Sequence, residues 1–120
     1  MTKIATDLEQ SKKLAEILPL ESADMLYYCS KESNTLIREE PFIRSFKETN
    51  TFSYVPCWSL AALLDVLPEG VIENYYAPNL QKENGKYSIA YGNEELLGIA
   101  DNPIDACYEM ILKLYELKTL

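Results

Sequence analysis

A two-residue turn signal is the feature of this chain that most constrains its fold. Asn84-Gly85 lies between two segments with strand-forming residues, Tyr75–Glu83 and Lys86–Tyr91. Asn-Gly is the pair that best tolerates the positive φ angles of a type I′ turn. The two-residue loop also fixes the register, with Leu80 opposite Ile89, because a shift of one residue would turn every side chain to the other face. The sequence therefore predicts an antiparallel hairpin.

The two faces of this hairpin differ in residue type. Tyr87, Ile89 and Tyr91 share the face of Leu80, and we expect that face to belong to the core. The other face carries small and polar residues: Asn79, Gln81, Ser88 and Ala90. It is either exposed to water or closely covered by a helix that needs small residues beneath it. Pro78 indicates that its strand lies at an edge or ends there.

A capped amphipathic helix follows the hairpin. Asp101-Asn102-Pro103 is a helix-start signal, and we expect the helix to cover about Pro103–Leu117. Asp105 and Glu109 fall on its outer side. The residues expected to face inward recur at helical spacing: Ile104, Cys107, Tyr108, Ile111, Leu114 and Tyr115.

The first half of the chain has a capping-box pattern at Thr6–Glu9, in which Thr6 and Glu9 satisfy each other's backbone amides. We expect a helix over about Asp7–Leu18, because Pro19 prevents its continuation. Met25–Ser30 is apolar on both alternate faces and reads as a strand covered from two sides. Thr35–Arg38 is its predicted partner strand.

The apolar run Pro56–Leu67 predicts a buried helix, because proline is compatible with a first turn and Pro68 with Gly70 ends the run. The 120 residues are enough for one domain with a core of its own. We therefore predict a single globular α+β domain over residues 1–120, in the order α-β-β-α-β-β-α, with a mostly antiparallel sheet packed with helices.

The chain contains no histidine, which excludes His-based triads, Cys–His nucleophiles and histidine metal sites. Cys57, at the expected start of a helix, is the one thiol with a physical argument for reactivity, although a packed cysteine is the commoner case. Two carboxylate pairs, Glu39-Glu40 and Glu94-Glu95, read as solvated loops rather than as acid/base sites. We expect no catalytic residue and no enzymatic activity.

Cofactors and structural staples are not predicted either. The four glycines do not match the spacing of the glycine-rich loops that bind nucleotide phosphates, so we expect no nucleotide cofactor. The three cysteines, Cys29, Cys57 and Cys107, are widely spaced and odd in number, so we expect neither a disulfide nor a metal site. No apolar run is long enough for a membrane span, and the first residues do not have the apolar core of a signal peptide. We therefore expect a cytoplasmic protein without membrane contact.

The formal net charge is −8 and is unevenly distributed. Residues 1–60 hold seven basic and nine acidic residues, whereas residues 61–120 hold four and ten. A phosphate backbone repels such a surface, so direct nucleic-acid binding is disfavoured unless Arg38, Arg44 and Lys47 form a local patch. Acidity of this size generally serves solubility, and the sharper alternative is a basic partner surface or mimicry of nucleic acid.

The candidate binding residues are aromatic or acidic. The segment Glu39–Tyr54 mixes charges with aromatics that have no clear internal role, and we expect it to be mobile or to face a partner. Trp58 reads either as core filling or as the lip of an aromatic pocket. The nine tyrosines suit equally well a sheet core and a binding patch. The residues predicted to bind a partner are Phe42, Phe46, Tyr54, Trp58, Glu94 and Glu95.

Several stretches resemble small uncharacterised proteins of gut Bacteroidetes and their phages: Pro56–Leu64, the opening with Ile4-Ala5-Thr6, Glu9–Leu14 and Ala23-Asp24-Met25, and the ending with Tyr87–Tyr91, Gly98 and Asn102–Ala106. The last third also looks like the strand-then-helix end of the phage alpha-beta-alpha sandwich domain and, more weakly, the HicB-like antitoxin fold. The resemblance implies a mobile-element accessory protein and brings no catalytic residues.

Two classes of function stay open from the sequence. The first is a non-enzymatic protein that acts by protein–protein interaction, for example a phage factor that engages a host protein. The second is a small-molecule or peptide binding protein with a pocket near the Trp58 helix. The sequence does not identify the partner or the oligomeric state.

Overall fold

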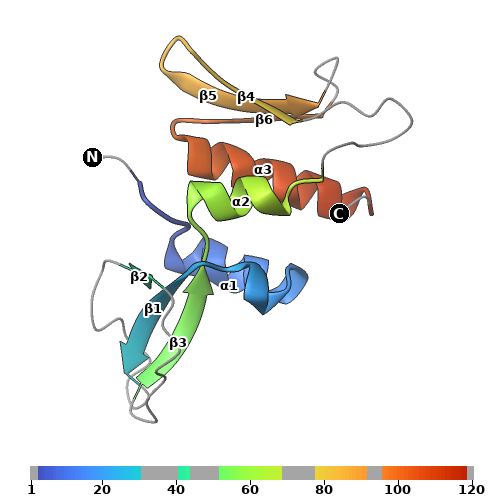
Figure 1. Ribbon diagram of the computed structural model, residues 1–120. Helices are drawn as coiled ribbons and strands as arrows, with labels where there is room; N and C mark the ends of the chain where they lie inside the picture. Colours follow the sequence, from blue (N-terminus) through green and yellow to red (C-terminus); the bar gives the residue numbers. More distant parts are fainter. Residues whose placement is uncertain (1–2, 31–40, 44–51, 69–77, 92–95, 119–120) are drawn as a thin grey trace. The chain divides into compact units, whose positions relative to one another are not determined.

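The computed structural model describes residues 3–30, 41–43, 52–68, 78–91 and 96–118, and these residues form an α+β fold (Figure 1). The predicted α+β class with antiparallel strand pairing is confirmed, but the single predicted sheet is wrong, because the structure has two. The strands form two separate three-stranded sheets, and each contains a strand that the sequence did not predict. The contacts divide the chain into two compact units, one of residues 5–62 and one of residues 63–120 together with 1–4.

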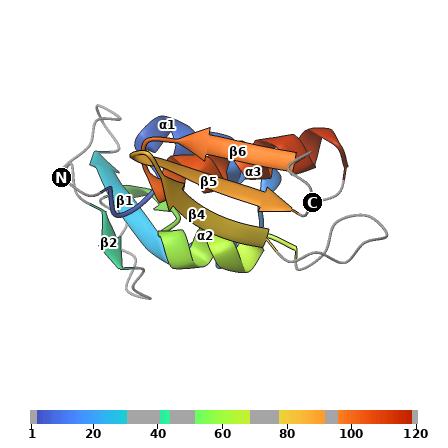
Figure 2. The ribbon, with the colours of Figure 1, turned by 90° about the horizontal axis from the view of Figure 1, so that it is seen from above.

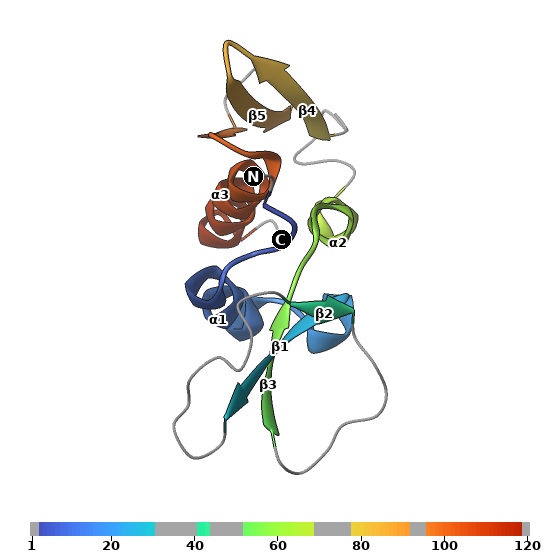
Figure 3. The same cartoon turned by 90° about the vertical axis from the view of Figure 1, so that its left-hand side faces the viewer.

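In the unit of residues 5–62, the sheet has the order β2-β1-β3, and both pairings are antiparallel (Figure 3). β1 occupies the predicted bounds, and α1 packs against β3. The predicted strand Thr35–Arg38 lies outside the described residues. The elements of this unit are α1 (Leu8–Ile17), a 3₁₀ turn (Leu20–Ser22), β1 (Met25–Ser30), β2 (Phe42–Ile43) and β3 (Phe52–Cys57).

The predicted cap of α1 is displaced by one residue. Asp7, and not Thr6, is the N-cap: its carboxylate accepts from the backbone N–H of Gln10 at 2.8 Å, and the Gln10 side chain accepts from the Asp7 N–H at 3.0 Å. The same capping-box logic therefore holds with a different pair. Thr6 is withdrawn into the core, where its hydroxyl accepts a hydrogen bond from the backbone N–H of Trp58.

The predicted helix over Pro56–Leu67 is wrong in its first turn. Pro56 and Cys57 belong to β3, and α2 covers only Leu60–Val66. Pro56 pairs with Leu26 of β1, and β3 is an outer strand of the sheet. An outer strand tolerates proline because the missing N–H is not needed by a neighbour. Apolar composition alone does not separate a buried strand from a buried helix.

In the other unit, the sheet has the order β4-β5-β6, which Figure 2 shows from above. The elements are β4 (Pro78–Glu83), β5 (Lys86–Tyr91), β6 (Leu96–Ala100) and α3 (Pro103–Glu116). The hairpin prediction is confirmed: Asn84 and Gly85 have φ of 51° and 76°, and Leu80 pairs with Ile89. β4 begins at Pro78 and is an outer strand, as the proline indicated.

The helix α3 has nearly the predicted bounds. Asn102 caps it by accepting from the Asp105 N–H at 2.8 Å, and Pro103 occupies the first turn. Of the residues expected to face inward, Tyr108 is half-buried and Tyr115 is exposed, because they lie at the border of the apolar stripe. The buried residues are Ile104, Ala106, Cys107, Met110, Ile111 and Leu114.

α3 covers the Ile89 face of the β4-β5-β6 sheet. Gly98, opposite Ile89 in register, lies so close to the helix that an added Cβ would stand 2.5 Å from the Ala106 carbonyl oxygen. The missing side chain is therefore what lets the helix approach β6. The opposite face is open to water at Asn79 and Gln81, which decides between the two readings of that face.

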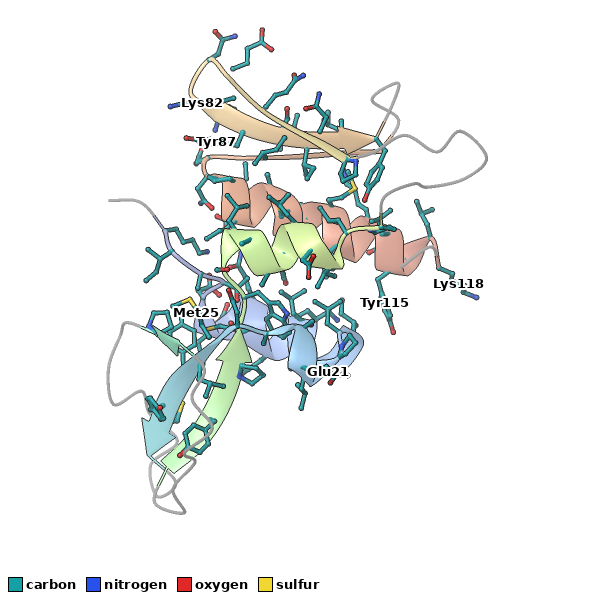
Figure 4. All side chains as sticks on the ribbon, viewed as in Figure 1. Glu21, Met25, Lys82, Tyr87, Tyr115 and Lys118 are labelled. Atoms are coloured by element: carbon teal, nitrogen blue, oxygen red, sulfur yellow. The ribbon has the colours of Figure 1, made fainter. Side chains whose placement is uncertain are left out.

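At the tip of the hairpin, the ammonium group of Lys82 lies 5.4 Å from the centre of the Tyr87 ring, and Figure 4 shows the two residues side by side. Within the described ranges, no helix combines the length and the apolar composition needed to cross a membrane.

Candidate functional site

A buried hydroxyl network occupies the centre of the unit of residues 5–62. The Thr6 and Ser11 hydroxyl oxygens lie 2.8 Å apart, and the Tyr27 hydroxyl donates to the Thr6 carbonyl at 2.8 Å. The Trp58 N–H donates to the Thr6 hydroxyl at 3.1 Å, while the Thr6 N–H donates to the Trp58 carbonyl at 2.9 Å. Every hydroxyl of the network has a hydrogen-bond partner within the protein. The network therefore stabilises the contact between the segment before α1 and the residue that follows β3.

Trp58 is fully buried at 0% exposure. Its indole N–H donates to the Ser22 hydroxyl at 2.9 Å, so the polar end of the ring is satisfied inside the protein. An enclosed ring with its donor occupied matches the core-filling interpretation of Trp58. The pocket-lip interpretation requires an accessible ring face, which this side chain does not offer.

Ser59 and Asp24 form the arrangement in this unit that most resembles an activated hydroxyl. The Ser59 hydroxyl donates to one Asp24 carboxylate oxygen, and the Ser59 N–H donates to the other at 2.9 Å. The same hydroxyl accepts from the N–H of Ala62 at 3.3 Å, at the first turn of α2. These contacts are those of a helix cap, and the chain has no histidine to relay a proton.

The Cys57 thiol is unsuited to nucleophilic work. Burial raises its pKa to about 12, and the negative charge of Asp24 adds to the effect. Burial likewise raises the pKa of Tyr27 to about 12, with smaller contributions from Cys57 and Asp7. Because the thiolate is the reactive form, a thiol held protonated near neutral pH is inert.

The other unit repeats this pattern with Cys107 and Tyr91. Burial raises the pKa of Cys107 to about 12. The pKa of Tyr91 is raised to about 12 by burial and by the nearby Cys107, and its hydroxyl donates to the Pro68 carbonyl at 2.7 Å. All three cysteines are buried as thiols. Within the described ranges, no three Cys, Asp or Glu side chains gather in a way that would hold a metal ion.

The β2-β1-β3 sheet has one aromatic face. Tyr28 and Tyr54 are directly opposite in the register of β1 and β3, and their rings meet edge to face with centres 5.1 Å apart. Both are half-buried, and Pro56 shares their face. α1 packs on the opposite face, where Leu8 and Val55 contact a core that contains Tyr27. The Tyr28–Tyr54 face therefore holds partly exposed, mutually fixed rings.

No family model matches this chain. The curated proteins and the solved structures gave no match either. The resemblance to phage proteins thus stays a prediction.

Of the six residues predicted to bind a partner, two have described side chains. Tyr54 lies on the Tyr28–Tyr54 face, and Trp58 is enclosed just beyond the end of β3. Phe42 is placed only by its backbone, in β2 opposite Leu26. Phe46, Glu94 and Glu95 lie outside the described residues. Sequence reasoning did not single out Tyr28, although its place in the predicted strand Met25–Ser30 made it available to a neighbouring strand.

Proposed function

We propose that this chain is a non-enzymatic interaction protein, a cytoplasmic accessory protein of a phage or another mobile element, that binds a protein partner. The observation that carries the proposal is the Tyr28–Tyr54 face. Tyrosine rings are large, rigid and amphipathic, so they lose little conformational entropy on binding and are enriched where proteins meet. The edge-to-face contact at 5.1 Å holds the two rings in place before any partner arrives.

The partner proposed here has a basic surface. The chain carries a net charge of −8, and a positively charged partner would be drawn to it at long range. Association should then weaken as salt rises, because exposed charges are screened over roughly 8 Å at physiological ionic strength. The phage association rests on the sequence resemblance alone.

The potentially reactive thiols and the Ser59 hydroxyl are engaged in packing and helix capping, which supports a role for the surface rather than for an active site. The Cys57 and Cys107 thiols are protonated and buried, and the Ser59 hydroxyl caps α2. The alternative of a small-molecule pocket beside Trp58 gains nothing from that ring, which is enclosed with its N–H bonded to Ser22.

Affinity capture with matched tyrosine deletions tests the proposal. The tagged wild-type chain and a Tyr28→Ala/Tyr54→Ala variant are incubated with a lysate of a gut Bacteroidetes host, and the captured proteins are quantified by mass spectrometry. Tyr115→Ala is the control, since Tyr115 is 51% exposed on α3 in the other unit. Figure 4 shows Tyr115 near the end of that helix.

We expect one protein that wild type and Tyr115→Ala retain and whose capture by the double variant falls at least tenfold, while the circular dichroism of the three chains is unchanged. Equal capture of that protein by all three chains would contradict the assignment of the face. Substrate turnover by the wild-type chain, abolished by one conservative substitution without loss of fold, would overturn the non-enzymatic reading.

A further inference from the structure

The backbone groups of β6 point in directions that follow from the hairpin turn. Glu83 and Lys86 close a two-residue turn, so they form a hydrogen-bonded pair, and such pairs alternate along antiparallel strands. Counting from the turn, the backbone groups of Ile89 point toward its partner Gly98 in β6. Those of the neighbouring Leu97 and Ile99 therefore point outward from the edge of the sheet.

The side chain of Lys113 agrees with this direction. Its ammonium group, which comes from α3, donates to the carbonyl of Leu97. Within the described part of this unit, no strand pairs with the outer edge of β6.

The two outer strands of this sheet present different edges. β4 begins with Pro78, which has no N–H to offer, and carries the charged Lys82 at another outward position. Proline and lysine on an outer strand are known means of preventing edge-to-edge pairing. β6 has the sequence Leu-Leu-Gly-Ile-Ala, without proline or charge, and Ile99 is 55% exposed. The edge of β6, unlike that of β4, therefore keeps its outward N–H groups and carries no charged side chain.

We propose that β6 pairs with β6 of a second copy of this chain, antiparallel and about a two-fold axis at Gly98. The axis places Leu97 opposite Ile99 of the second copy, and Ile99 opposite Leu97. Each of these pairs exchanges the outward N–H and C=O groups of both residues, so the edge is complementary to itself. Leu97 and Ile99 of both copies then form one apolar stripe on the face that α3 does not cover.

The charges on α3 fit the same axis. Gly98 lies beside the Ala106 carbonyl and the Met110 amide, which places this part of α3 next to the axis. Lys113 reaches the level of Leu97 from one side, and Glu109 lies one turn earlier on the same side of the helix. The axis brings Lys113 of each copy to Glu109 of the other. These contacts locally oppose the repulsion between two chains of net charge −8.

The pairing also leaves room for two helices. Paired strands lie about 4.8 Å apart. Because α3 contacts both β6 and β5, its axis is displaced inward from the edge. The axes of the two copies are then separated by more than one strand spacing, close to the 8–10 Å at which helices pack. When the second copy binds, the Leu97 carbonyl accepts a hydrogen bond from the Ile99 amide of that copy. The Lys113 ammonium group then leaves this carbonyl and pairs with the Glu109 carboxylate of the second copy.

Sedimentation velocity of the full chain, over a concentration series, tests this inference. The wild type should approach twice the 13.7 kDa of one chain. Ile99→Pro removes an outward amide without removing a bond to β5, and it should leave a folded monomer. The matched control is Lys82→Pro, which makes the same change at the outward edge of β4 and should remain dimeric.

A charge exchange keeps the test decisive if Ile99→Pro fails to fold. Glu109→Lys should raise the dimer dissociation constant at least about tenfold, and adding Lys113→Glu should restore it, since close interfacial charge pairs contribute this much. A monomeric wild type at every concentration would overturn the proposal. So would a dimer that Ile99→Pro and Glu109→Lys both leave intact, or stronger self-association in Lys113→Met, which would show that Lys113 guards the edge.

Discussion

The two units of this molecule are stabilised in different ways. In residues 5–62, the decisive contacts join positions far apart in the chain: Thr6 and Trp58 exchange two hydrogen bonds across 52 residues. In residues 63–120, the shape is set by neighbours, through the turn at Asn84-Gly85 and the cap at Asn102. The first kind of structure depends on a buried polar network, and the second on local conformational preferences joined by an apolar core.

Trp58→Ala should have the largest effect on stability. Emptying a fully buried aromatic site lowers the free energy of unfolding by roughly 3–5 kcal/mol, and the Ser22 hydroxyl also loses its donor. Urea unfolding measures the change. Tyr115→Ala, at an exposed position, should stay within about 0.5 kcal/mol of wild type. A Trp58→Ala chain that melts like wild type but loses a partner would make Trp58 a binding residue.

Gly98→Ala tests the apolar core of the other unit with a single added methyl group. Its Cβ would meet the Ala106 carbonyl oxygen at 2.5 Å, and a backbone atom cannot move aside as a flexible side chain can. We expect a loss of about 3 kcal/mol, at the upper end of overpacking effects. Chemical unfolding measures it, and an unchanged midpoint would show that α3 does not approach β6 so closely.

Thr6→Val tests whether the long-range network holds residues 5–62 together. The variant keeps the shape of the side chain but leaves the buried Trp58 amide without its acceptor, which should cost about 2 kcal/mol. Ser11→Ala is the comparison, and its loss should be smaller because Thr6 keeps the contact with Trp58. If both variants lose the same amount in thermal unfolding, the Trp58 amide does not depend on Thr6.

Gly85→Val tests the local signal that sets the hairpin. At φ of 76° a β-branched residue is strained, so we expect a loss on the order of 1 kcal/mol or more. Glycine at position 84 can also adopt the positive φ of the turn, so Asn84→Gly should change the free energy of unfolding by only a few tenths of the change expected for Gly85→Val. Equal stabilities of the two variants by calorimetry would contradict the positive-φ turn.

The buried thiols predict a fall in stability at alkaline pH. A cysteine of the unfolded chain loses its proton near its ordinary pKa of 9.0, whereas Cys57 and Cys107 hold theirs to about 12. Between these values the unfolded state releases protons first, so the free energy of unfolding decreases as pH rises from 9 toward 12. Cys57→Ala should show a shallower decrease in a pH series of urea melts.

Thiol labelling gives the same test near neutral pH. The native chain should label slowly and incompletely, and fully only after denaturation. Fast labelling of Cys57 alone would restore the reactive-thiol hypothesis.

The contrast between the units also explains what could be predicted from the sequence. The hairpin register and α3 followed from residues within one turn of each other, such as Asn84-Gly85 and Asn102-Pro103. The one-residue shift of the α1 cap could not be foreseen, because it depends on a hydrogen bond from the Trp58 backbone N–H to the Thr6 hydroxyl, 52 residues away in the chain. The end of β3 was missed, since Pro56 suits a first helical turn as well as an outer strand.

The candidate site was predictable to a smaller extent. Tyr54 was singled out for its residue type, but its pairing with Tyr28 is a consequence of strand register between segments that the sequence does not link. The outward direction of Leu97 and Ile99 follows from the turn only once β6 is known to pair with β5.

Hydrogen exchange of the Trp58→Ala variant, followed by mass spectrometry, tests most directly whether the two units are held by separate means. We expect amides of α1, β1 and β3 to lose protection by at least about tenfold, because the core of this unit has lost its fully buried indole ring and the bond from that ring to Ser22. Those of β4, β5 and α3 should keep theirs. An equal loss of protection in both units would contradict the account and favour the single cooperative domain over residues 1–120 that the sequence predicts.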